Sequence, residues 1–144
     1  MKWYFASRRR HEKEIKYLID NLSEFGHETS FDWTSLGGLK PYEENESVCR
    51  ENSYKISNAI KNSDIFVIIS DKEGTDMFIE LGIAVGSNIQ KKLPRVYVIG
   101  EYNQRSLMHF HPSINRIKTI DDVFNIECPE ILSSGKFISP KFNF

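Results

Sequence analysis

Ile65-Phe66-Val67-Ile68-Ile69 is a run of five consecutive apolar residues, most of them β-branched. β-Branched side chains favour extended structure, and an unbroken apolar run is typical of a strand that is covered on both faces. Such strands occur in parallel sheets, which lie between two layers of helices. We therefore predict that residues 65–69 form a central strand of a parallel α/β sheet.

The rest of the chain alternates between short apolar segments and longer segments of helical periodicity. This alternation predicts βαβ units with right-handed crossovers and a five-stranded parallel sheet. Gly26 follows the first helical segment, in the position where a left-handed residue ends a helix. The other predicted strands are 3–6, 28–33, 95–99 and 115–120, the predicted helices are 11–25, 46–62, 76–90 and 121–126, and 35–45 is a predicted loop.

The composition predicts one ordinary globular domain. The chain has 144 residues, of which 40% are hydrophobic and 27% are charged. We expect the domain to span residues 1–127, followed by a C-terminal tail, 128–144, that has two prolines and no clear period. Cys49 and Cys128 share no motif, so they predict neither a disulfide framework nor a zinc site.

Charge and hydropathy exclude several classes of partner. The formal net charge is −1, whereas a nucleic-acid polymer or a membrane surface usually requires a basic excess. No segment approaches the roughly 18 apolar residues of a membrane span. The apolar start of the chain is too short for a secretory signal. We therefore expect a cytoplasmic protein.

In parallel α/β sheets, ligands bind beyond the carboxyl ends of the strands, where the strand order reverses. Glu80 is the sharpest candidate there, because it is the only charged residue between Met77 and Gly86. No residue three or four positions away offers it a helical ion pair. A carboxylate in the expected cleft suits nucleophilic attack on a sugar carbon, as in retaining glycosidases. A singly exposed helix glutamate is the alternative interpretation.

Ser7-Arg8-Arg9-Arg10 directly follows the first predicted strand. A hydroxyl, guanidinium groups and free helix N–H groups together suit a phosphate, although solvated arginines are the plainer interpretation. No pattern typical of nucleoside triphosphate or dinucleotide binding accompanies them. Trp33 could stack on a base or simply pack, and Gly74-Thr75-Asp76 predicts a turn and helix N-cap. His109 and His111 lack a third ligand, so we predict no metal.

Four segments together resemble the nucleoside 2-deoxyribosyltransferase superfamily, which includes the 2′-deoxynucleoside 5′-phosphate N-hydrolases. The resemblance spans roughly residues 2–125 and implies a Rossmann-like (flavodoxin-like) three-layer sandwich. It also implies cleavage of N-glycosidic bonds without metal or cofactor, in homodimers with shared active sites. The segments are Tyr4-Phe5-Ala6-Ser7, Ser63-Asp64-Ile65-Phe66-Val67-Ile68-Ile69, Gly74-Thr75 and Glu80-Leu81-Gly82-Ile83-Ala84.

The resemblance implies that Glu80 is the nucleophile and that Tyr4 orients it. Ser106-Leu107-Met108 is similar to a segment that a partner chain supplies, with a serine near the 5′-phosphate in the nucleotide hydrolases. Ile56 stands where many members have an aspartate that assists the base or sugar, so Asp32, Asp71 or Asp76 would have to substitute. The Gly-Thr pair also lies two residues further from the glutamate than is usual in the family.

We therefore predict an N-glycosidase that acts on a (deoxy)nucleoside 5′-monophosphate. The alternatives are a nucleoside 2-deoxyribosyltransferase, a nucleotide-binding sensor that has lost its chemistry, and an NAD-cleaving enzyme of the TIR type. The predicted catalytic residues are Glu80, Tyr4 and Asp76, and the predicted substrate-binding residues are Ser7, Arg8, Arg10, Asp32, Trp33, Gly74, Thr75, Ser106 and Met108.

Overall fold

The computed structural model describes residues 1–144 and contains one five-stranded sheet in which every pairing is parallel. Its strand order is β2-β1-β3-β4-β5. The chain therefore builds outward from β1 in one direction and from β3 in the other, which creates a topological switch point between these two strands. The strands are β1 (Lys2–Ala6), β2 (Glu28–Thr29), β3 (Ile65–Ile69), β4 (Arg95–Ile99) and β5 (Ile114–Ile117).

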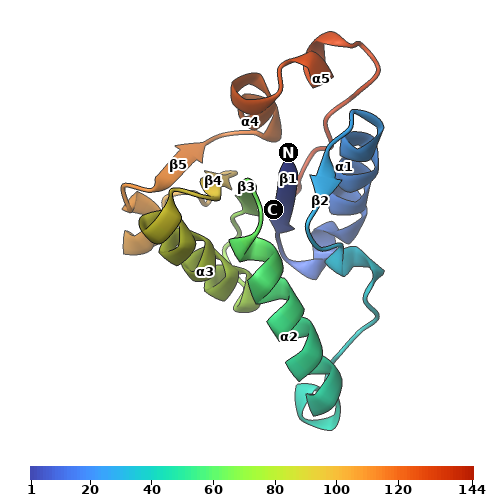
Figure 1. Ribbon diagram of the computed structural model, residues 1–144, viewed down its shortest axis with the longest axis vertical. Helices are drawn as coiled ribbons and strands as arrows, with labels where there is room; N and C mark the ends of the chain where they lie inside the picture. The colour runs from blue at the N-terminus through green and yellow to red at the C-terminus, as the bar shows by residue number, and fades with distance from the viewer.

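Helices cover both faces of the sheet (Figure 1). The helices α1 (Glu12–Glu24), α4 (Ile120–Glu127) and α5 (Glu130–Ser133) contribute to one apolar core, and α2 (Glu46–Lys61) and α3 (Asp76–Lys91) contribute to the other. The predicted three-layer α/β sandwich is confirmed. None of these helices combines the length and the apolar composition that a membrane span requires.

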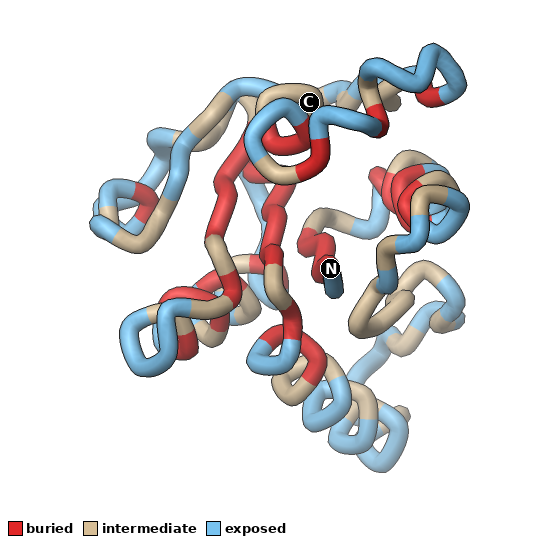
Figure 2. The backbone as a smooth tube through the Cα atoms, turned by 45° about the horizontal axis from the view of Figure 1, so that its top comes forward, coloured by how far each residue is buried: buried red, intermediate tan, exposed pale blue.

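Strand β3 explains the apolar run from which the prediction started. Ile65, Val67 and Ile69 point into the core beneath α1 and α4, whereas Phe66 and Ile68 point into the core beneath α3. All five residues are buried, and the central strands form the buried interior of the molecule (Figure 2). An alternating pattern would have placed charged side chains in one of the two cores.

Helix α1 ends just before Gly26, the glycine that predicts its end in the sequence. Gly26 has a φ of +79°. Its N–H donates to Ser23, and the N–H of His27 donates to Leu22. These two bonds form the Schellman motif, in which a glycine takes the left-handed position after the helix.

Two strands are shorter than the sequence pattern predicts, and β5 also begins one residue earlier. Strand β2 pairs with β1 only at Glu28–Thr29, because the chain then enters a 3-10 turn, Trp33–Ser35, which Asp32 caps. Strand β5 ends at Ile117 because Thr119 and Asp122 form a capping box that starts α4. In both places a local side-chain hydrogen bond ends the strand.

The segment 128–144 packs against the body of the molecule. Cys128, Ile131 and Phe137 are buried in the core that contains α1, and Phe142 and Phe144 pack against that core. The two terminal aromatic rings also contact the imidazole of His11. The segment contains α5 and otherwise has no regular structure.

Candidate active site

Two cavities adjoin at the carboxyl ends of β1 and β3, beside the switch point. The polar cavity, of about 450 Å³, lies between the segment after β1 and the start of α3. The α2–α3 cavity, of about 640 Å³, lies between those two helices and the residues that precede α2. Glu80, Asp76 and Tyr42 line both cavities, together with Leu36 and Leu39.

The polar cavity gathers most of the substrate-binding residues that the sequence predicts. These residues come from the end of β1, from the turn after β2 and from the loop before α3, which are far apart in the sequence. The sheet topology brings them together. They are Ser7, Arg8, Arg10, Trp33, Gly74 and Thr75.

The α2–α3 cavity has a largely apolar wall. Ile56 of α2 forms part of this wall and faces the same cavity as Ile79 and Ile83 of α3. An apolar side chain at position 56 cannot hydrogen-bond a ligand. Polar groups are supplied instead by Asn52, Ser53 and Ser57 of α2.

Glu80 lies in the second turn of α3, where the two cavities meet. Burial raises the pKa of its carboxyl group to about 8, the nearby Tyr4 hydroxyl opposes that rise, and the charge of Asp76 adds to it. Asp76 precedes Glu80 by four residues and therefore shares its helix face. With a pKa of about 8, roughly a tenth of the Glu80 carboxyls are ionised at pH 7.

This raised pKa predicts a specific pH dependence of stability. Between the ordinary pKa of 4.5 and the folded value of about 8, the folded state holds a proton that the unfolded state has lost. Because Glu80 is ionised only in the unfolded state here, the free energy of unfolding falls as the pH rises through this window, by up to about 1.4 kcal/mol per pH unit. We expect Glu80→Gln, relative to wild type, to gain stability steadily from pH 5 to pH 8.

Thermal or urea unfolding of both proteins across this range measures the effect. The contribution of Glu80 to the free energy of unfolding is present in full below pH 4.5 and is lost as the pH rises through about 8. The free energy of unfolding of Glu80→Gln minus that of wild type must therefore increase with pH. Parallel curves would show that Glu80 titrates as an ordinary exposed carboxyl.

Tyr4 is fully buried on β1, where its ring stacks on Phe66 with the ring centroids 5.7 Å apart. Its hydroxyl has no partner at ordinary hydrogen-bond geometry within the protein. Burial raises the pKa of Tyr4 well above its ordinary value, and the Glu80 carboxyl is the acidic group that acts on it. The ring is therefore fixed, with Glu80 as the neighbour of its hydroxyl.

The predicted phosphate-binding arginines are paired with acids in the structure. Asp71 is fully buried, and its Oδ2 lies 2.6 Å from Arg10 Nη2. Arg8 Nη1 lies 2.9 Å from Glu73 Oε2 and 3.8 Å from Asp71 Oδ1. Arg9 serves a different purpose, since its guanidinium donates to the backbone carbonyls of residues 36 and 37 and so holds the loop over the cavities.

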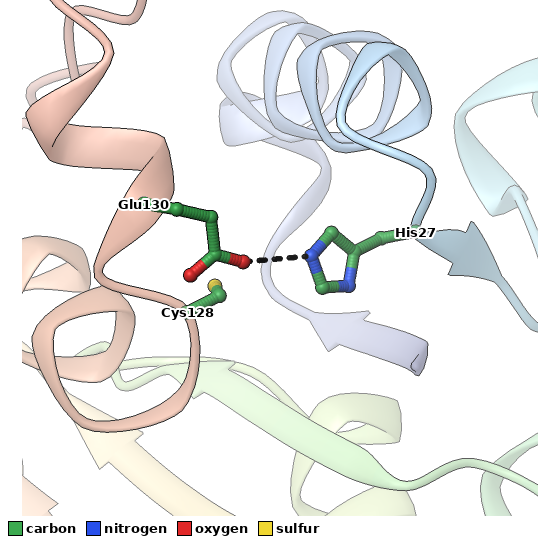
Figure 3. A group of neighbouring side chains, drawn as sticks. All are labelled: His27, Cys128 and Glu130. Carbon is green, nitrogen blue, oxygen red and sulfur yellow. Dashed lines mark ion pairs between the residues drawn. The ribbon is translucent and has the colours of Figure 1, made fainter.

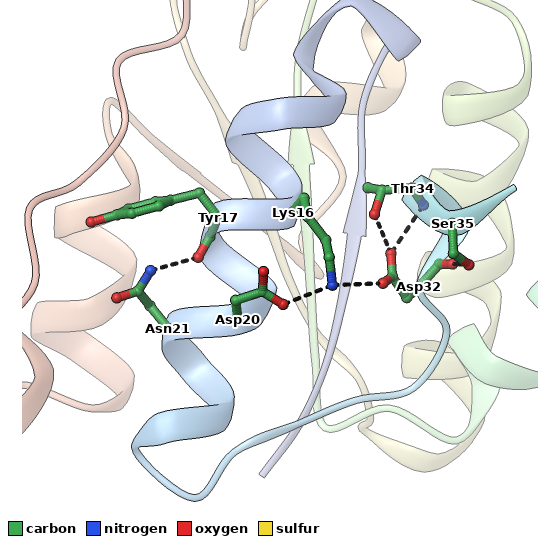
Figure 4. Close-up of polar contacts among 7 residues, drawn as sticks. All are labelled: Lys16, Tyr17, Asp20, Asn21, Asp32, Thr34 and Ser35. Atoms are coloured by element: carbon green, nitrogen blue, oxygen red, sulfur yellow. Dashed lines mark hydrogen bonds and ion pairs between the residues drawn. The ribbon is translucent and has the colours of Figure 1, made fainter. Parts of the chain in front are cut away.

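Asp32 lines neither cavity. Its carboxylate accepts hydrogen bonds from the N–H and hydroxyl of Thr34, and Lys16 Nζ of α1 lies 3.4 Å from it (Figure 4). It is therefore engaged in capping the 3-10 turn. The neighbouring Trp33 donates its indole N–H to the carbonyl of Phe5 at 2.7 Å, which fixes its ring at the polar cavity.

The loop before α3 brings the backbone close to the polar cavity. Gly74 has a φ of +127°, and a Cβ there would lie 2.8 Å from Met77 Sδ. Thr75 occupies the N-cap position of α3 as predicted, but its side chain makes no capping hydrogen bond. Its hydroxyl is thus not committed to the helix.

Ser106 and Met108 line neither cavity of their own chain. They lie on and before an exposed 3-10 turn, Leu107–Phe110. The turn packs beside α3, where the rings of Phe78 and His109 approach to 5.9 Å between centroids. The structure of one chain does not bring this segment to Glu80.

Tyr42 is the functional candidate that sequence reasoning missed. Its hydroxyl lies 3.5 Å from the Asp76 carboxylate, and its half-exposed ring lines both cavities. It belongs to a 3-10 turn, Tyr42–Glu44, in the segment that the sequence predicts only as a loop. An aromatic residue that follows two glycines and a proline in a predicted loop was the available signal.

His27, Cys128 and Glu130 form a cluster of possible metal ligands (Figure 3). The cluster is distant in the fold from these cavities. His27 Nδ1 accepts a hydrogen bond from the indole N–H of Trp3 at 3.2 Å. The neutral ring must then carry its proton on Nε2, which faces Glu130 Oε1 at 3.8 Å. Burial raises the pKa of the Cys128 thiol to about 12. The cluster joins the start of the sheet to α5.

The fold and the cavities together define a Rossmann-like α/β protein with two adjoining cavities at its switch point. The sequence matches no family model and no curated protein. Among solved structures, the chain is similar to the Clostridium botulinum CMP N-glycosidase BcmB, with a TM-score of 0.56, 17% identity, and coverage of 91% of this chain and 99% of that chain. This likeness confirms the predicted Rossmann-like fold.

Proposed function

We propose that this chain is an enzyme that cleaves the N-glycosidic bond of a (deoxy)nucleoside 5′-monophosphate, with Glu80 as the nucleophile. The observation that carries the proposal is the position of Glu80 where an arginine-lined cavity meets a largely apolar one. A nucleotide has the same division, with a phosphate at one end, a flat base at the other and the anomeric carbon between. The similar solved structure is that of a CMP N-glycosidase.

The two cavities suggest how such a substrate lies. Arg8 and Arg10 supply guanidinium groups, and Ser7 a hydroxyl, at the end suited to the phosphate. The base lies in the α2–α3 cavity against Ile56 and beside Tyr42. This arrangement leaves the sugar next to the Glu80 carboxyl.

The reaction then proceeds in two displacements. An ionised oxygen of Glu80 forms a bond to C1′, the C1′–N bond breaks, and its electron pair leaves with the base. The departing base takes its proton from water in the cleft; Asp76 lines both cavities and is our candidate for holding that water, whereas Asp32 lines neither. The hydroxide that this water leaves then attacks C1′, and the C1′–O bond to Glu80 breaks with its electron pair returning to the carboxylate. A second base in place of water would make the same intermediate a transferase reaction.

We further propose that a second copy of the chain completes the site. Helix α3 presents an unpartnered face on which Ile79, Gly82, Gly86 and Ile89 are exposed, and a Cβ added to either glycine would meet nothing within 4 Å. The neighbouring 3-10 turn exposes Leu107, Met108 and Phe110. Exposed apolar side chains of this kind are typical of an interface, and a partner there could supply Ser106 and Met108.

The dimer can be tested by Gly86→Arg. The new side chain has space in a single chain and is a better helix former than glycine, so we expect the fold to be retained. Close approach of a second helix would be blocked, and we expect a monomer with at least a tenfold loss of base release. Sedimentation velocity measures the mass, and Ser23→Arg, on the exposed face of α1, is the matched control. Wild-type protein that sediments as a monomer would contradict the proposal.

Release of free base, followed by chromatography, tests the function itself. We expect wild-type protein to release base from nucleoside monophosphates, with CMP and dCMP tested first, and to act poorly on the corresponding nucleosides. Release of nicotinamide from NAD alone would favour the TIR-type alternative. Nucleotide binding without release of any base would favour the sensor, for which the apolar Ile56 in the cavity wall is the supporting observation.

A further inference from the structure

The loop between β3 and α3 carries two acids that face the arginines of the polar cavity. Asp71, fully buried, lies 2.6 Å from Arg10. Glu73 lies 2.9 Å from Arg8, and its side chain is 63% exposed. Each arginine that could bind a ligand anion therefore already has a carboxylate of the same chain as its nearest partner.

The two ion pairs differ in how easily they can be broken. The Asp71 carboxylate lies among Arg8, Arg10 and His11 and also accepts the N–H of Glu73 at 3.2 Å. Moving Arg10 away would leave the buried charge of Asp71 without its nearest partner, which is costly. The pair between Glu73 and Arg8 is open to solvent on the Glu73 side, and pairs with free access to water contribute little to stability. Arg8 is therefore the guanidinium from which a carboxylate can be displaced at low cost.

We propose that Glu73 occupies the position of the substrate phosphate on Arg8 in the unliganded protein, and that the phosphate displaces it on binding. This inference rests on the proposed function. A phosphate binds a guanidinium through two parallel hydrogen bonds and carries more charge than a carboxylate, so the exchange favours the ligand. Asp71 keeps Arg10 in place while Arg8 changes partners.

The exchange makes Glu73 a specificity-determining residue. A nucleoside without a phosphate leaves Glu73 on Arg8, and Glu73 then has no effect on its binding. A nucleoside monophosphate must compete with Glu73. Removing the carboxylate should therefore strengthen the binding of phosphorylated ligands and leave the binding of unphosphorylated ones unchanged.

Titration calorimetry with inorganic phosphate tests the proposal without any turnover. We expect Glu73→Gln and Glu73→Ala to bind phosphate about fivefold more tightly than wild type, which is the size of effect expected from losing an exposed ion pair. Glu51→Gln removes an equal charge from an exposed pair on α2 that lines neither cavity, and it controls for net charge. In an Arg8→Ala background, Glu73→Gln should give no gain.

Equal affinity in the Glu73 variants and in Glu51→Gln would overturn the exchange, and so would a gain that persists without Arg8. Phosphate binding too weak to measure in every variant would overturn it as well. Base release is measured separately. Tighter phosphate binding in a protein that releases no base would support the exchange and refute the proposed reaction. Base release in a protein whose phosphate affinity does not change in the Glu73 variants would support the proposed reaction and refute the exchange.

Discussion

Glu80→Gln is expected to lower the rate of base release from a nucleoside monophosphate by at least about a thousandfold, since an amide cannot form the glycosyl ester. The fold should be retained, because Gln has nearly the same shape and the carboxyl it replaces is costly to ionise in the folded protein. The measurement is the initial rate of base release at saturating substrate, with circular dichroism to verify folding.

The matched control is Glu46→Gln. Glu46 also lines the α2–α3 cavity, but it is exposed and paired with Arg50 at 2.6 Å. We expect its replacement to change the rate by less than severalfold. If the rate of Glu80→Gln stays within tenfold of wild type, Glu80 is not the nucleophile. If both variants lose the same activity, the loss comes from the negative charge of the cavity and not from nucleophilic attack by Glu80.

The pH dependence of kcat/KM is the second large effect. Only the ionised carboxylate attacks, and burial holds the pKa of Glu80 at about 8. Below that value the ionised fraction falls tenfold per pH unit, so kcat/KM should rise with pH and level off above about 8. At pH 6 it should be about a hundredfold below the plateau. Initial rates at low substrate concentration from pH 5.5 to pH 9.5 measure this profile.

Tyr4→Phe provides the internal control for that profile. The Tyr4 hydroxyl favours the ionised form of Glu80 and lowers its pKa. Removing the hydroxyl should move the midpoint of the profile to higher pH, with a smaller change in the plateau. A wild-type profile that is already flat from pH 5.5, or a midpoint that moves downward in Tyr4→Phe, would contradict the assigned roles of both residues.

Those parts of the fold that depend on local patterns were predictable from the sequence. The run from Ile65 to Ile69 indicates a strand covered on both faces, and Gly26 indicates the end of α1. Strand β2 was overpredicted because Asp32 caps a turn, and a hydrogen bond of that kind competes with sheet pairing without changing the apolar pattern. The C-terminal segment lacks any period, so its packing through Ile131 and Phe137 depends on tertiary contacts alone.

Part of the candidate site was likewise predictable from the sequence, and part was not. The segment Ser7–Arg10 directly follows β1, and Glu80 lies in the helix that follows β3, so the topology rule brings them to the same edge of the sheet. The pairing of Arg10 with Asp71 and the position of Tyr42 depend on how loops fold back over the sheet. Those loops carry no periodic signal. Ser106 lies outside both cavities of its own chain, so the role that we propose for it requires a second copy.

Mass spectrometry of a trapped intermediate tests the central claim most directly. A 2′-fluoro nucleoside monophosphate slows both displacements, because the fluorine destabilises positive charge at C1′. When wild-type protein is mixed with this analogue and quenched in acid, we expect it to gain the mass of one fluorinated sugar phosphate, and peptide mapping should place the adduct on Glu80. Base release from the analogue with no adduct on the protein, or with the adduct on another residue, would contradict nucleophilic catalysis by Glu80.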